Sequence, residues 1–192
     1  VVPYYNKPSQ EGLYQHFKAI SENTQLPICL YNIPGRSGIN MTPETIARLS
    51  ELNNIVAIKE AAGSVEQVKK IRQLTHSSFN IYSGDDGLTL SFLQEGACGV
   101  VSVASHLVGP QIKEMIKLFN EGQLAAAKAI DQSLQDLFNV LFITSNPAPV
   151  KAALNQFGFQ VGHPRLPIVT VNDEEAEKIK TVLDALTVTE TV

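Results

Sequence analysis

Short apolar runs recur along the first two thirds of the chain and predict the strands of a parallel sheet. Their first residues lie 20–27 positions apart, and each run is followed by a polar or glycine-containing turn and an amphipathic stretch, as in successive βα units. The runs are apolar without alternation, which is typical of strands covered on both faces. The predicted strands are residues 1–5, Ile28–Asn32, Ile55–Glu60, 79–83 and 99–104.

Helix signals lie between and after these runs. Thr42-Pro43-Glu44 supplies an N-cap, a proline at the first helical position and an acidic first turn. Ser64, followed three residues later by Gln67, fits a capping box. A further helix is expected to end at Gly122, with apolar residues at helical spacing: Ile112, Met115, Ile116 and Phe119. Beyond it, only helices are predicted, the last one capped by Asn172 or Asp173.

Five βα units fit either an open doubly wound sheet or a (β/α)8 TIM barrel. An open nucleotide-binding sheet usually carries an early glycine-rich phosphate loop, and the sequence contains neither GxGxxG nor a P-loop. A barrel needs eight strands, so three would precede Val1, where the chain starts without methionine in a strand already under way. We therefore expect an α/β fold in which residues 1–122 form the C-terminal part of a (β/α)8 barrel and residues 123–192 a C-terminal helical extension, the N-terminal barrel strands being absent from this chain.

The composition excludes several classes of protein. Of the 192 residues, 44% are hydrophobic and 18% charged, so the chain can bury a core. The net charge of −4 and the lack of basic runs argue against a nucleic-acid surface, and no segment approaches the ~20 apolar residues of a membrane span. Cys29 and Cys98 lie in apolar runs and are interpreted as reduced core residues of an intracellular protein.

Lys59 is the first candidate for chemistry, because it follows four apolar residues at the end of a predicted strand. Burial lowers the pKa of a lysine, and a neutral amine can attack a carbonyl to form a Schiff base. The alternative is that the strand ends at Ile58 and that Lys59 points into water. In either parallel architecture an active site forms beyond the C-terminal ends of the strands, where Lys59 stands.

Other polar residues at the predicted strand ends suit imine chemistry on a keto acid. Tyr31 and Tyr5 are candidates to move protons during imine formation, and Arg36 offers a bidentate fork for a carboxylate. Each has a plainer interpretation, as a packed tyrosine or a solvated loop arginine. Asp85 and Asp86 are more typical of a turn and a helix cap than of a metal site. The four histidines are scattered without ligand spacing, so we expect no metal.

Four ordered motifs resemble the dihydrodipicolinate synthase family of the pyruvate-dependent class I aldolase superfamily. The resemblance runs from Val1 to about Leu186 and is far more specific for the ordered set than for any single motif. The motifs are Tyr4-Tyr5-Asn6-Lys7-Pro8, Tyr31-Asn32-Ile33-Pro34-Gly35-Arg36-Ser37-Gly38, Ile58-Lys59-Glu60-Ala61 and Ser83-Gly84-Asp85-Asp86.

The resemblance implies a cytoplasmic lyase that condenses pyruvate with L-aspartate 4-semialdehyde in the diaminopimelate route to lysine. Lys59 would form the Schiff base and Tyr31 would relay protons, with Tyr5 extending the relay into a neighbouring subunit of a homotetramer, a dimer of dimers. Arg36 would bind the semialdehyde carboxylate, and Gly84 and Val101 would line the pyruvate pocket. It implies no cofactor and no nucleic-acid or membrane partner.

Two other interpretations stay open. The chain is also similar to other lyases of the superfamily, such as N-acetylneuraminate lyase or a keto-deoxy sugar acid aldolase, although the Arg36 loop and the motif around Gly84 favour the synthase. The second interpretation is a non-catalytic protein, a truncated barrel without enzymatic activity. Such a barrel would expose strand edges and associate with other chains.

Overall fold

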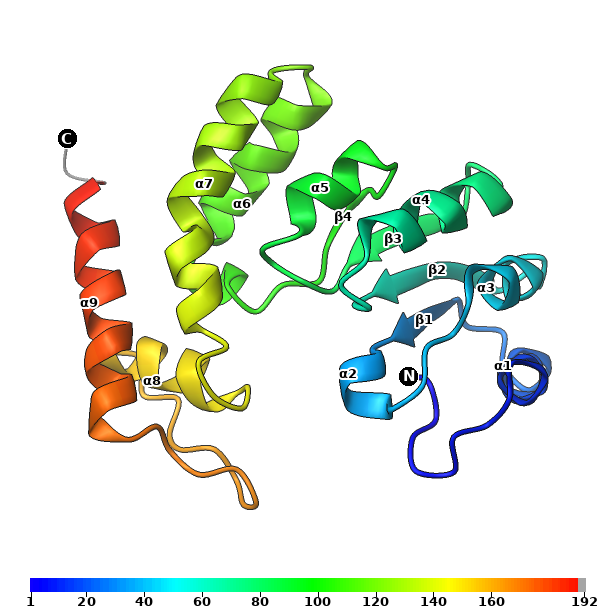
Figure 1. The fold of residues 1–192 in the computed structure, drawn as a ribbon, viewed down its shortest axis with the longest axis horizontal. Helices are drawn as coiled ribbons and strands as arrows, with labels where there is room; N and C mark the ends of the chain where they lie inside the picture. The colour runs from blue at the N-terminus through cyan, green and yellow to red at the C-terminus, as the bar shows by residue number, and fades with distance from the viewer. Residues whose placement is uncertain (190–192) are drawn as a thin grey trace. The chain divides into compact units, whose positions relative to one another are not determined.

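The computed structural model describes residues 1–189, with the side chains of residues 1–186 (Figure 1). The chain divides into two compact units, Val1–Val101 and Ser102–Val192, which are described separately. This division separates two compact units of the chain and does not mark where the barrel ends. The expected boundary between residues 122 and 123 concerns the end of the barrel and stays a prediction.

The first unit is a four-stranded parallel sheet with its connecting helices. The strands are β1 (Ile28–Asn32), β2 (Ile55–Glu60), β3 (Asn80–Ser83) and β4 (Gly99–Val100), and they lie side by side in chain order. The helices are α1 (Gln10–Glu22), α2 (Pro34–Ser37), α3 (Pro43–Ser50), α4 (Val65–Leu74) and α5 (Thr89–Gln94). The predicted bounds of β1 and β2 are confirmed, and β3 starts one residue later than predicted.

Two strand predictions were wrong in whole or in part. Residues 1–5 form no strand: Val2 N–H donates to Tyr31 O at 2.9 Å, but Pro3 has no N–H and Tyr5 has a φ of 58°, so the pairing cannot continue. The predicted strand 99–104 contains only Gly99–Val100, and Ser102 already bonds the turn that starts the next helix.

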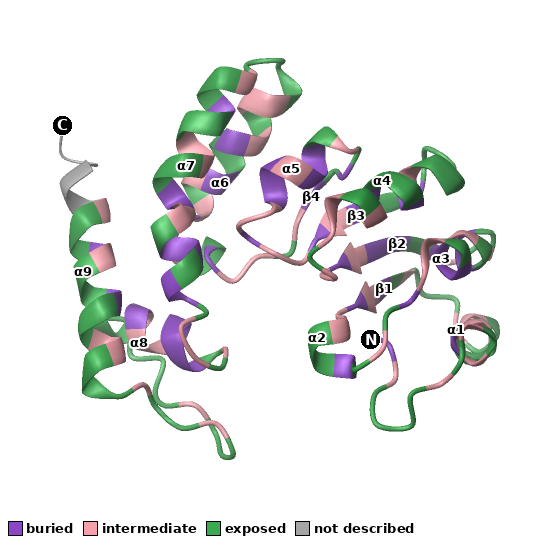
Figure 2. Cartoon of the chain, in the orientation of Figure 1, coloured by how far each residue is buried: buried purple, intermediate pink, exposed green. Residues whose placement is uncertain are grey.

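The core lies on one face of the sheet. Leu30, Ile58 and Ile81 point to this face from three adjacent strands and have no exposed surface. Helices α1, α3, α4 and α5 cover them with their own buried residues: Leu13, Phe17, Ile46, Leu49, Val68, Ile71 and Phe92. On the other face Tyr31 and Lys59 are only half-buried. Figure 2 shows buried and half-buried segments side by side in the strands of the sheet. Ala57, which alternation places on the same face as Lys59, is buried, so cover of this second face is partial in the described residues.

The cysteines also differ from the prediction. Both Cys29 and Cys98 are exposed, whereas the prediction placed them in the core. Cys29 precedes the inward-facing Leu30 by one residue, so strand alternation turns its thiol away from the helices.

The predicted helix caps form. Thr42 and Ser64 hydroxyls accept hydrogen bonds from the N–H groups of Thr45 and Gln67 at the starts of α3 and α4. The reciprocal half of the capping box at Ser64 was predicted wrongly, because the side chain of Gln67 bonds Asn40 and Glu60 instead.

The second unit contains the helices α6 (Ser105–Asn120), α7 (Leu124–Val140), α8 (Ala148–Gln156) and α9 (Asp173–Thr189). Gly122, with a φ of +77°, separates α6 from α7 as predicted. Asn172 caps α9: its Oδ1 accepts from Glu175 N–H, and its own N–H donates to Glu175 Oε2, both at 2.9 Å. Within residues 1–189 no helix has both the length and the apolar character required to cross a bilayer.

The cap of α9 yields the first prediction. Asn172→Ala removes the side-chain acceptor and should lower the opening free energy of α9 by about 0.5–2 kcal/mol, measured by hydrogen exchange of its amides. Asn172→Asp keeps the acceptor and should retain the protection. Equal protection in the alanine variant and the native chain would contradict the role of this cap.

Candidate functional site

The sheet register places Tyr31 beside Lys59 on the face opposite the core. Tyr31 of β1 pairs with Lys59 of β2, and Lys59 pairs with Tyr82 of β3. The Nζ of Lys59 lies over the Tyr31 ring, 4.3 Å from its centroid. No carboxylate of the described residues forms an ion pair with this amine. The half-buried amine of Lys59 therefore contacts an aromatic face and has no ionic partner among the described residues.

Gly84 follows β3 and packs against the stem of Lys59. Its N–H donates to Glu60 O at 2.8 Å, which ties the start of the turn to β2. A Cβ at position 84 would lie 3.0 Å from Lys59 Cε and 2.7 Å from Ala61 Cβ. Any larger residue must therefore displace the lysine side chain or the neighbouring backbone.

Tyr5 and Val101 lie at the ends of segments next to the sheet. The bond from Val2 to Tyr31 O brings the first segment alongside β1, and Tyr5 comes three residues later with its side chain 86% exposed. Val101 follows β4, where its N–H donates to Ser83 O at 2.8 Å. Its side chain is 47% exposed. Both side chains are thus available to a ligand or to another chain.

Arg36 lies in a short helix instead of the loop predicted for it. Helix α2 starts directly after β1 with Pro34 and ends at Gly38, whose φ of 78° is the left-handed conformation that glycine adopts readily. Arg36 is exposed and forms no ion pair with a described residue. Its guanidinium is therefore free to bind an anion near the C-terminal end of β1.

Glu60 is a buried carboxylate that sequence analysis did not single out as functional. It has no exposed surface, and it accepts hydrogen bonds from Asn32 Nδ2 at 3.0 and 3.1 Å, Gln67 Nε2 at 3.1 Å and Ala62 N–H at 2.7 Å. Burial raises the pKa of Glu60, and these hydrogen bonds oppose the rise. The signal in the sequence was its place directly after Lys59, since alternation turns it toward the core.

Tyr82 is a second residue that the sequence analysis missed. It occupies the register position next to Lys59, and the nearby thiol group of Cys98 is the main cause that raises the pKa of Tyr82. Although Cys29 as a residue is exposed, partial loss of water around its thiol raises the pKa of Cys29, and the nearby Lys59 opposes this rise. The face that carries Lys59 thus also carries thiol and phenol groups.

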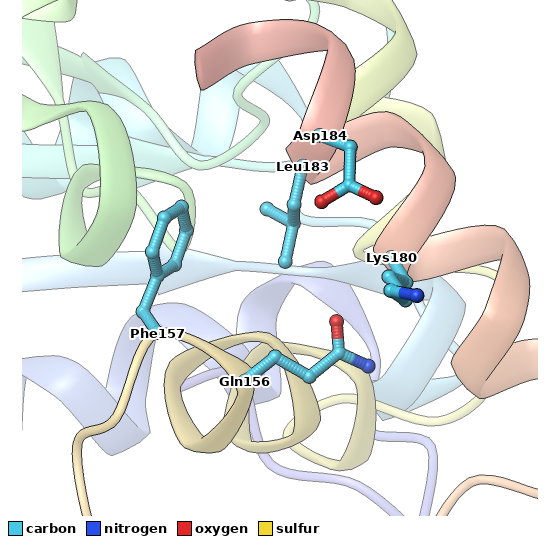
Figure 3. Close-up of a pocket in the computed structure, with 5 residues that line it drawn as sticks. All are labelled: Gln156, Phe157, Lys180, Leu183 and Asp184. Carbon is cyan, nitrogen blue, oxygen red and sulfur yellow. The ribbon is translucent and has the colours of Figure 1, made fainter.

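Two hollows lined by described residues of the second unit contain none of the predicted site residues. One of about 280 Å³ lies where Lys180, Leu183 and Asp184 of α9 face the end of α8 (Figure 3). Another, of about 580 Å³, is lined mainly by α7 and α9. Among the described residues no three metal-binding side chains gather at one place.

Fold and site together define a segment of a parallel βα protein in which a lysine and a tyrosine are paired at the C-terminal ends of two adjacent strands. The profile of the dihydrodipicolinate synthetase family matches residues 1–186, and the chain belongs to this family. Its sheet is accordingly part of a (β/α)8 barrel, as predicted.

The similarity to individual relatives is high over nearly the whole chain. The chain is 55% identical to the 4-hydroxy-tetrahydrodipicolinate synthase of Desulforudis audaxviator and 57% identical to that of a Cyanothece strain. These alignments cover 95% and 97% of this chain, respectively. The crystal structure of the Cyanidioschyzon merolae synthase with lysine bound aligns with this chain at a TM-score of 0.94 and 49% identity. The alignment covers 96% of this chain and 63% of that structure. The chain spans 62% and 64% of the length of the two curated relatives.

The packing of Gly84 yields a prediction on stability. Gly84→Ala should lower the free energy of unfolding by about 1–3 kcal/mol, because the new methyl group meets Ala61 and Lys59. Gly35→Ala is the matched control, since no atom lies within 4 Å of a Cβ there, and it should change stability by less than about 0.5 kcal/mol. Urea unfolding measures both, and an equal change in the two variants would contradict the close packing.

Proposed function

We propose that the polypeptide containing these residues is a Schiff-base lyase that condenses pyruvate with L-aspartate 4-semialdehyde to 4-hydroxy-tetrahydrodipicolinate, in the diaminopimelate route to lysine. This proposal rests mainly on the position of the Lys59 amine. The amine lies over the Tyr31 ring and has no ionic partner among the described residues. Membership of the family supports the choice of substrates.

In the first half of the reaction, the Lys59 amine attacks the ketone of pyruvate. The carbinolamine loses one water to give the imine, and Tyr31 passes the protons that this exchange requires. The contact between Lys59 and the Tyr31 ring supports this pairing. Loss of a proton from the methyl group then gives an enamine.

In the second half, the enamine carbon attacks the aldehyde of the semialdehyde. The amino group of that substrate then attacks the imine carbon, which closes the ring and releases the Lys59 amine. Arg36 binds the semialdehyde carboxylate through its guanidinium, while Gly84 and Val101 line the space around pyruvate. The exposure of Arg36 and the contact of Gly84 with the lysine stem support these roles.

The proposal includes assembly into a cytoplasmic homotetramer, a dimer of dimers that needs no cofactor. Tyr5 extends the proton relay into the site of a neighbouring subunit. Support comes from the exposed neighbours Tyr4 and Tyr5, at 71% and 86%, because two adjacent exposed aromatic residues are typical of an interface. Analytical ultracentrifugation measures the assembly.

Lys59 is tested by trapping the imine. Lys59→Ala should abolish the covalent adduct that forms with pyruvate and borohydride, because no other amine would take its place. Lys69→Ala, an exposed lysine of α4, is the control and should leave the adduct intact. Intact mass and peptide mapping locate the adduct, and an undiminished adduct in the Lys59 variant would refute the assignment.

Arg36 is tested by a comparison of the two substrates. Arg36→Ala should raise the KM for the semialdehyde roughly 10- to 100-fold, the effect of one lost charge-assisted contact, and change the KM for pyruvate by less than about threefold. Arg165→Ala, another exposed arginine, should change neither. Equal effects on both substrates would contradict the role. Faster condensation of sugar aldehydes than of the semialdehyde would favour a different lyase of the superfamily.

A further inference from the structure

We propose that the buried carboxylate of Glu60 is a positioning residue that holds Lys59 against Tyr31 and thereby sets the rate of imine formation. The inference rests on the proposed function for its kinetic part. Its structural part, the position of the lysine amine, can be measured without any substrate.

Two successive residue pairs follow one another in the register of β1 and β2. Tyr31 pairs with Lys59, and the next residues, Asn32 and Glu60, pair with each other. Because side chains alternate along a strand, the first pair faces away from the core and the second pair faces into it. Asn32 and Glu60 both have no exposed surface, so a side-chain link between them lies directly behind the reactive pair.

The link between Asn32 and Glu60 extends to the segments around the two strand ends. Asn32 Oδ1 accepts from Met41 N–H at 3.0 Å, and its Nδ2 also donates to Asn40 Oδ1 at 2.7 Å. Gln67 of α4 bonds both Asn40 and Glu60. The hydrogen-bonded cluster around Glu60 therefore joins β1, β2, the start of α4 and the segment before α3.

The groups around the Glu60 carboxylate are all hydrogen-bond donors, as an ionised carboxylate requires. Asn32, Gln67 and the N–H of Ala62 all donate to its two oxygens. A proton or an amide group in place of either oxygen would face a donor, and a buried donor without an acceptor is costly. The isosteric change Glu60→Gln therefore breaks the cluster without altering its size.

The first measurement is the position of the lysine amine. After reductive ¹³C-methylation, the Lys59 methyl signal, identified by its loss in Lys59→Arg, should be shifted upfield by the Tyr31 ring. Glu60→Gln should lose most of this shift, whereas the matched control Glu66→Gln, an exposed glutamate of α4, should keep it. Tyr31→Leu defines the unshifted position.

The second measurement is the rate of pyruvate trapping by borohydride. Glu60→Gln and Asn32→Asp should each slow it roughly 10- to 100-fold, as expected for a small misplacement of a reacting group. The double variant should recover part of the rate, because the new carboxylate at position 32 can accept from the new amide at position 60 and from Met41 N–H, while the bond to Asn40 Oδ1 stays lost. A role in stability alone predicts a native trapping rate in each single variant that folds.

The outcomes separate the two proposals. A folded Glu60→Gln protein with the native methyl shift and trapping rate overturns the positioning role, and so does additive loss in the double variant. If Glu60→Gln does not fold, Gln67→Met decides by the same two measurements, since Gln67 is only half-buried. If the native protein shows the methyl shift but traps no pyruvate, the proposed function fails while the methyl shift still decides the structural part.

Discussion

The alternation of side chains along β1 and β2 is the constraint on which the first unit depends. One residue separates the aromatic–amine pair, Tyr31 and Lys59, from the buried pair, Asn32 and Glu60. A shift of either strand by one residue would put the amine into the core and the carboxylate on the open face. The apolar residues Leu30 and Ile58 prevent this shift, because both are fully buried against the helices. The core and the reactive face are therefore specified together.

A buried carboxylate without a cation is costly unless hydrogen bonds replace its water. At Glu60 the replacement comes from groups that would otherwise lack partners at the end of the strand, including the N–H of Ala62 beyond β2. The amides of Asn32 and Gln67 supply the rest, and each also bonds Asn40. The cost of burial is thus offset only when the strand ends and the start of α4 have the observed arrangement. This dependence ties the ends of β1 and β2 and the start of α4 together directly after Lys59.

The sequence predicted what depends on local pattern and missed what depends on distant partners. Apolar runs defined the bounds of β1 and β2, and Thr42, Ser64 and Gly122 marked helix ends correctly. The rule that parallel strands end at a common edge was enough to group Lys59 with Tyr31. Residues 1–5 were predicted as a strand because their side chains are apolar, although Pro3 and the positive φ of Tyr5 prevent pairing. The second partner of Gln67 and the neighbours of Tyr82 are far apart in sequence, so no local pattern could reveal them.

The order of the strands explains why the motif order was so informative. In this sheet the strands lie side by side in chain order, so strand ends that follow one another in sequence are neighbours in space. The arginine-bearing helix, the lysine and the close-packed glycine come from three consecutive βα units. In a sheet with crossed strand order, the same motifs at the same spacing would be separated by intervening strands. The order of the motifs along the chain therefore predicts their order across the sheet. Each motif lies next to the motifs of the preceding and following strands.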